Sequence, residues 1–152
     1  MATSDLVCSI YPYFLVPEAN LEKFQELCDR FVEKTHQEPK CLYYGFSFNG
    51  LEVHCREAYE DADALLNHLQ NVGDILNEAL QIAELTRLEI HGASSELAKL
   101  KEPLKDFAVQ YFELQYGFRN RQFKSEVQQV LMMTARILHS ECDSQAIFLV
   151  DY

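Results

Sequence analysis

Three residues near the middle of the chain, Glu57, Tyr59 and His68, carry side chains suited to proton transfer. His68 lies between Leu65 and Val72 on the flank of a predicted helical stripe, where an imidazole exchanges protons near neutral pH. Glu57 and Tyr59 share the parity of an apolar strand face, and burial would raise the pKa of such a carboxyl into the range of a usable base. The structural alternatives are a backbone-bonded imidazole and a solvated carboxylate at the strand end.

A second set of polar residues follows the opposite parity of two predicted strands. Two histidines and two glutamates are among them, so a divalent metal site is conceivable. Alternating charges on a sheet face more often pair with one another or face water, and we therefore predict no metal. The residues of this set are Glu52, His54, Arg56, Arg87, Glu89 and His91.

Motifs for other chemistries are missing from the sequence. It has no Gly-x-Ser-x-Gly turn and no glycine-rich phosphate loop. Its five cysteines include no CxxC pair, which argues against both a disulfide framework and a zinc knuckle. We predict that the protein works without a cofactor, carrying neither haem nor flavin.

The composition is that of one globular domain. A chain of 152 residues, 48% hydrophobic and 24% charged, can bury a sizeable core. The net charge of −11 would repel phosphate backbones, so nucleic acid is not an expected partner. No apolar run approaches the ~20 residues of a membrane span, and the N-terminus lacks the pattern of a signal peptide. We expect a cytoplasmic protein without membrane contact.

Hydrophobic periodicity predicts the elements that must position the polar residues. Runs with a period of two predict strands at 6–16, on both sides of Asn49-Gly50, at 85–92 and at 111–119. Helical stripes follow at about 20–36, from an Asp61 cap to about residue 83, and from a Ser94 or Ser95 cap towards Pro103. A further helix at 123–139 and a strand or tail at 146–150 form an extension, so we expect a domain at 1–119 and an extension at 120–152.

The Asn49-Gly50 pair predicts a two-residue hairpin turn, because both residues tolerate positive φ. That turn would place Phe48 opposite Leu51 and Phe46 opposite Val53. One face of the hairpin is then apolar and one polar. We expect the apolar side to line a pocket and the polar side to form a dimer face. The predicted lining residues are Tyr44, Phe46, Phe112 and Tyr116, and the predicted dimer-face residues are Tyr43, Glu52, His54 and Arg56.

The order β-α-β-β-α-β-α-β predicts an α+β fold: a ferredoxin-like split βαβ antiparallel sheet with helices on one face and a C-terminal helix extension. Within this order, the stretch 56–69 resembles the antibiotic biosynthesis monooxygenase-like family. The similarity lies in Glu57-x-Tyr59, the acidic cap Asp61 and His68 about two turns later.

The resemblance implies a dimeric α+β barrel with a small-molecule pocket between sheet and helices in each subunit. It places Glu57, Tyr59 and His68 at or near that pocket. The sequence departs from the family pattern in two places: it has no Trp, and Asn71-Val72-Gly73 stands where a second His is often found. Haem-degrading relatives are argued against because His68 stands at their Trp position and their haem-ligand position falls near Glu78.

The resemblance implies that the protein is an enzyme acting on a small molecule. The implied reaction is cofactor-independent monooxygenation of a phenolic or quinol-like compound. The alternative is a non-catalytic dimeric module that binds or senses a small ligand. Pocket groups with perturbed pKa would favour the enzyme, whereas a sealed and wholly apolar interior would favour the module. We expect His68, rather than His54 or His91, to carry the chemistry.

Overall fold

The computed structural model describes residues 3–120, and the chain divides into two units, Met1–Gly117 and Phe118–Tyr152. The fold below is that of the first unit. The predicted helix at 123–139 and the predicted tail at 146–150 lie outside the described residues.

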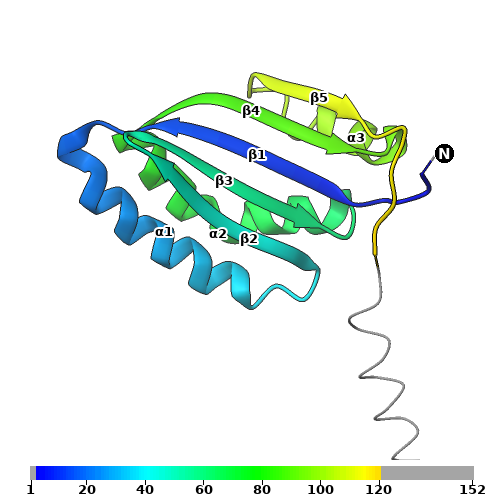
Figure 1. Ribbon diagram of the computed structural model, residues 1–152, viewed down its shortest axis with the longest axis horizontal. Helices are drawn as coiled ribbons and strands as arrows, with labels where there is room; N and C mark the ends of the chain where they lie inside the picture. The colour runs from blue at the N-terminus through cyan, green and yellow to red at the C-terminus, as the bar shows by residue number, and fades with distance from the viewer. Residues whose placement is uncertain (1–2, 121–152) are drawn as a thin grey trace, which may run out of the picture. The chain divides into compact units, whose positions relative to one another are not determined.

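The first unit is an α+β domain built on a five-stranded sheet in the order β2-β3-β1-β4-β5 (Figure 1). The prediction of the fold class is thereby confirmed. Along the chain the elements are β1 (Cys8–Leu15), η1 (Glu18–Asn20), α1 (Leu21–His36), β2 (Cys41–Asn49), β3 (Glu52–Tyr59), α2 (Ala62–Ile82), β4 (Glu84–Gly92), α3 (Ser94–Lys101) and β5 (Val109–Glu113).

The sheet is mixed rather than wholly antiparallel. β1 pairs antiparallel with β3 and β4, and β2 with β3, but β5 runs parallel to β4. The chain leaves β4, passes through α3 and returns in the same direction, which is the crossover that a parallel pair requires. β5 is also shorter than the predicted strand at 111–119, since it ends at Glu113.

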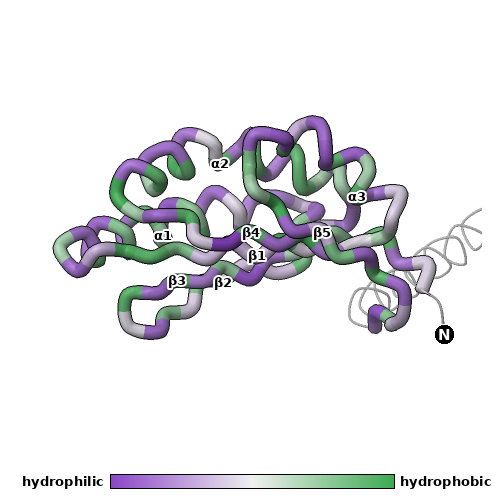
Figure 2. The backbone as a smooth tube through the Cα atoms, turned by 90° about the horizontal axis from the view of Figure 1, so that it is seen from above, coloured by the Kyte–Doolittle hydropathy of each residue, from purple (hydrophilic) through white to green (hydrophobic). Residues whose placement is uncertain are grey.

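The three α-helices of residues 3–120, α1, α2 and α3, lie on one side of the sheet (Figure 2). α1 and α2 bury apolar stripes against the β1–β3 half, where Phe14, Phe24 and Val53 are nearly inaccessible. α3 and the start of α2 cover the other half, around Ile10, Leu65, Ile90 and other apolar side chains. One sheet face is therefore covered and the other is open, as the alternation of the strands predicts.

The N-terminus of α2, the helix that carries His68, is fixed by two carboxylates. The backbone N–H of Ala64 donates to Asp61 Oδ1 at 2.7 Å, which confirms the predicted cap. The N–H of Ala62 donates to Glu96 Oε2 of α3 at 3.0 Å. In α3 itself the predicted serine cap is wrong, because Ala93 stands at the N-cap, and the helix ends two residues before Pro103.

The hairpin register is two residues away from the predicted one. Phe48 pairs with Val53 and Asn49 with Glu52, so the turn residues are Gly50 and Leu51. Gly50 has a φ of 60° and no described non-glycine residue has positive φ, so Asn49 stays in the strand. A shift of two residues preserves the face of every side chain, and the predicted separation of apolar and polar sides therefore survives.

Candidate functional site

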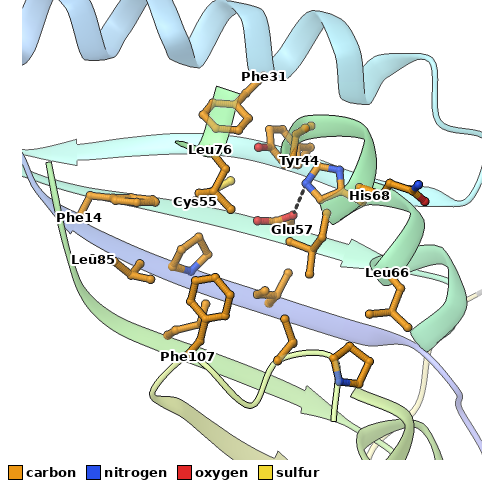
Figure 3. A pocket seen from close by; sticks show the side chains of 18 of the residues that line it. Phe14, Phe31, Tyr44, Cys55, Glu57, Leu66, His68, Leu76, Leu85 and Phe107 are labelled. Atoms are coloured by element: carbon orange, nitrogen blue, oxygen red, sulfur yellow. Dashed lines mark ion pairs between the residues drawn. The ribbon is translucent and has the colours of Figure 1, made fainter. Parts of the chain in front are cut away.

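A cavity of about 330 Å³ lies between the covered face of the sheet and the helices (Figure 3). Most of its wall is apolar, and none of the described residues that line it is a Lys or an Arg. Its lining consists of Ile10, Pro12, Phe14, Phe31, Tyr44, Phe46, Cys55, Glu57, Leu66, His68, Leu69, Gln70, Val72, Leu76, Leu85, Leu88, Pro103, Leu104 and Phe107. Such a wall suits an uncharged, largely apolar ligand and offers no cation for a phosphate or carboxylate.

Glu57 is the carboxyl group of this wall. β3 holds it on the covered face, where it is only 4% exposed. The hydroxyl of Tyr59 donates a hydrogen bond to Glu57 Oε2, and His68 Nε2 lies 3.3 Å from the same oxygen. Burial raises the pKa of Glu57 to about 8, against a smaller lowering by the Tyr59 hydrogen bond. Glu57 is therefore largely protonated at neutral pH.

His68 stands beside it on α2 and is 2% exposed, deeper than the flank position that the sequence predicts. Its Nδ1 atom lies 3.0 and 3.1 Å from the two carboxylate oxygens of Glu38. Burial lowers the pKa of His68, while the Glu38 charge and hydrogen bond oppose that shift. The ring is thus held as a neutral imidazole between two carboxyl groups.

Two tyrosine rings enclose the imidazole. The ring centroid of Tyr59 lies 4.8 Å from that of His68, and the centroid of Tyr44 lies 5.4 Å away. Burial raises the pKa of both phenols, with the charge of Glu57 as the next cause, so both stay neutral. Tyr44 also lines the cavity. Tyr59 is not among the lining residues, but its hydroxyl is hydrogen-bonded to Glu57, which is.

The structure brings together the three residues expected to carry chemistry, and it places Tyr44 and Phe46 in the cavity wall. Phe112 and Tyr116 are not in that wall, so the expectation for these two is corrected. Phe112 pairs with His91 in the β4–β5 register and its ring stacks on the His91 ring at 4.5 Å, while Tyr116 is 73% exposed. The parallel crossover sets this register.

The open face carries the residues predicted for a dimer contact. The Arg56 guanidinium lies 5.5 Å from the ring centroid of Tyr43, and His54 stacks on Tyr13 at 4.3 Å. Glu52 is exposed near the hairpin turn. No helix within residues 3–120 covers this face. In the same part of the chain, no group of three or more His, Cys, Asp or Glu side chains is arranged to hold a metal ion.

Glu38 is a site residue that the sequence reasoning missed. It lies between α1 and β2, where no periodicity marks it, and it meets His68 across a separation of 30 residues. Asn71 joins this contact by donating from Nδ2 to Glu38 Oε1 at 2.6 Å. The result is a polar row of Glu38, His68 and Glu57 that reaches the apolar cavity, with Tyr59 bonded to Glu57.

This fold, a ferredoxin-like sheet with one face covered by helices, is shared with solved structures of antibiotic biosynthesis monooxygenase-like proteins. MupZ from Pseudomonas fluorescens is 48% identical to this chain, with a TM-score of 0.73, and the match covers 78% of this chain and 98% of MupZ. The chain belongs to the same family as MupZ, and its likeness to antibiotic biosynthesis monooxygenase-like proteins is shown at the level of the fold. No protein-family model and no curated protein matches it.

More distant solved structures share the fold alone. A putative antibiotic biosynthesis monooxygenase from Nitrosomonas europaea is 14% identical, with a TM-score of 0.55 and coverage of 62% of this chain and 96% of that one. A conserved protein from Methanosarcina mazei is 21% identical, with a TM-score of 0.52 and coverage of 57% of this chain and 92% of that one.

No helix among residues 3–120 is long and apolar enough to cross a membrane.

Proposed function

We propose that the chain is a small-molecule enzyme in which Glu57 exchanges a proton with an uncharged, largely apolar substrate. The observation that carries this proposal is a buried carboxyl group in the wall of an apolar cavity, bonded to Tyr59 and His68, with no Lys or Arg in the lining. Carboxyl groups without a role in catalysis are ordinarily exposed to solvent or paired with a cation. Perturbed titratable groups in a concave site are typical of catalysis.

The reaction we assign is cofactor-independent oxygenation of a phenolic or quinol-like compound. The family resemblance supplies the reaction class, and the site supplies the base. A carboxylate whose proton binds with a pKa of about 8 is a much stronger base than an ordinary glutamate, and its strength approaches that of a phenolate. Proton removal gives an electron-rich anion that can react with dissolved O₂. The substrate itself supplies the two reducing electrons, one oxygen atom enters the product and the other leaves as water.

The test is oxygen uptake with a panel of phenols and quinols, read against Glu57→Gln. We expect substrate-dependent O₂ consumption by the wild type and incorporation of ¹⁸O from ¹⁸O₂ into the product. Glu57→Gln should bind the same compound but leave the oxygen concentration unchanged. Binding without turnover by the wild type across the panel would favour the non-catalytic module that the apolar lining also suits.

A homodimer formed through the open face is the second part of the proposal. Tyr43, Tyr13 and His54 present ring surfaces there, and Arg56 and Arg87 cross two of these rings. Tyr43, on the edge strand β2, is 42% exposed, so part of its ring is available for contact. A second copy of the same face would cover these rings.

The cytoplasmic location of the protein stays a prediction.

A further inference from the structure

Glu38 occupies an unusual place for a loop carboxylate. Its side chain is 17% exposed, and both of its oxygens lie within hydrogen-bond distance of His68 Nδ1. Asn71 Nδ2 adds a third contact at 2.6 Å. Glu38 also borders two smaller hollows whose lining includes neither His68 nor Glu57. Glu38 therefore ends the polar row at the surface, while Glu57 ends it at the cavity.

An ionised carboxylate only accepts hydrogen bonds, so the His68 nitrogen facing Glu38 must carry the proton. In a neutral imidazole the other nitrogen is then an acceptor, and that nitrogen is the Nε2 atom 3.3 Å from Glu57. The opposite tautomer would leave a lone pair of Nδ1 against the negative charge of Glu38. The contact thus selects one of the two tautomers.

We propose that Glu38 is the positioning residue of the site, holding His68 in the Nδ1–H tautomer so that Nε2 accepts the proton of Glu57. This inference rests on the proposed function, in which Glu57 exchanges a proton with the substrate. When the proton passes from Glu57 to Nε2, a carboxylate and an imidazolium form together and no net charge is created. Glu38 stabilises that imidazolium from its other side.

A purely structural role is the competing account. Lys34 Nζ donates to the Asn71 carbonyl at 2.6 Å, so the segment around Glu38 already has a second tie to α2. If Glu38 only fastened its loop, removing the Asn71 contact would matter as much as removing the His68 contact. The two roles can be distinguished, because only the tautomer role predicts a change in which nitrogen of the His68 imidazole carries the proton.

The experiment is ¹⁵N NMR of the histidine side chains in the full chain, with the His68 signals assigned by their loss in His68→Gln. The wild type should show protonated Nδ1 and unprotonated Nε2. Glu38→Gln keeps an acceptor oxygen and should keep that tautomer, while the titration of His68 moves to lower pH because a negative charge is gone. Glu38→Leu should shift the tautomer ratio towards Nε2–H about tenfold or more, the scale of one charge-assisted hydrogen bond.

Asn71→Leu is the matched control, since it removes the other partner of Glu38 and should leave the tautomer unchanged. An Nε2–H tautomer in the wild type would overturn the proposal, and so would a wild-type ratio in folded Glu38→Leu. If Glu38→Leu does not fold, the titration decides: an unchanged His68 midpoint in Glu38→Gln contradicts the proposal. None of these readings needs turnover, so failure of the oxygenase assignment would be seen separately in the oxygen assay.

Discussion

Each face of the sheet carries a Glu–His pair, and the two pairs have opposite surroundings. On the covered face, Glu57 Oε2 lies 3.3 Å from His68 Nε2, and both side chains are buried beneath helices. On the open face, Glu89 Oε2 lies 3.9 Å from His91 Nε2, and Arg87 forms an ion pair with the same carboxylate. Glu89 is also nearly buried, at 7% exposure, so burial alone does not distinguish the pairs.

The difference lies in what faces each carboxyl. Arg87 compensates the charge of Glu89, and such pairing usually makes a carboxylate structural. Glu57 meets a phenol and a neutral imidazole instead, and without a cation its charged form is disfavoured. Residue type therefore does not decide which pair can do chemistry; the presence or absence of a compensating charge does.

The largest expected effect concerns the two carboxyl groups themselves. Glu57→Gln should lower turnover of an accepted phenolic substrate by about 10²–10⁴-fold, the usual contribution of a general acid or base. Glu89→Gln is the matched change on the open face and should leave turnover within about twofold of the wild type. Steady-state oxygen uptake compares them. Equal losses in both variants would remove the distinction between the faces.

The raised pKa of Glu57 should also make the free energy of unfolding depend on pH. Between the unfolded pKa of about 4.3 and the folded value of about 8, the native protein holds a proton on Glu57 that the unfolded chain has lost. The free energy of unfolding should therefore fall as pH rises, by up to about 1.4 kcal/mol per pH unit from this group, and level off above pH 8. Urea unfolding at several pH values measures it. Glu57→Gln should lack this decline, and an identical pH profile in both proteins would refute it.

Charge reversal on the open face tests the other side of the comparison. Arg56→Glu should weaken self-association tenfold or more, because it places a carboxylate against the Tyr43 ring in the proposed interface. Arg30→Glu is the control, since Arg30 pairs with exposed Glu78 on the helical side. Sedimentation velocity at micromolar concentration gives both constants. A wild type that remains monomeric there would contradict the dimer.

The smallest effect concerns the turn that keeps both faces in register. Gly50→Ala should cost about 1 kcal/mol of unfolding free energy, because φ at this position is 60°. Gly45→Ala is the control within β2, where φ is not positive and an added Cβ meets nothing within 4 Å. Thermal or urea unfolding compares the two. A Gly50→Ala protein as stable as the wild type would contradict a positive φ at Gly50.

Local sequence patterns predict much of this fold. The stripe of α2 and the parity of Glu57 and Tyr59 follow from periods of 3.6 and 2, so the sequence places these two side chains on the apolar sheet face and His68 at the border of the stripe. The hairpin was placed correctly but its register was not, because the predicted turn needs positive φ at both Asn49 and Gly50, whereas only Gly50 has it and Asn49 pairs with Glu52 in the sheet.

The missed features depend on contacts distant in sequence. Glu38 reaches His68 only because the loop after α1 folds back onto α2, and no spacing within 30 residues encodes that approach. The position of Phe112 followed from the parallel pairing of β5 with β4, whereas the sequence analysis assumed an antiparallel strand. Periodicity also does not reveal that the carboxyl in the cavity wall has no cation beside it.

The most direct test of the account is a ¹³C NMR titration of the Glu57 side-chain carboxyl, with the resonance identified by its loss in Glu57→Gln. The account predicts a midpoint at about pH 8, with the carboxyl largely protonated at neutral pH. A midpoint near the ordinary glutamate value of about 4.3 would contradict it, because Glu57 would then be a permanently ionised carboxylate and not a base tuned for proton transfer.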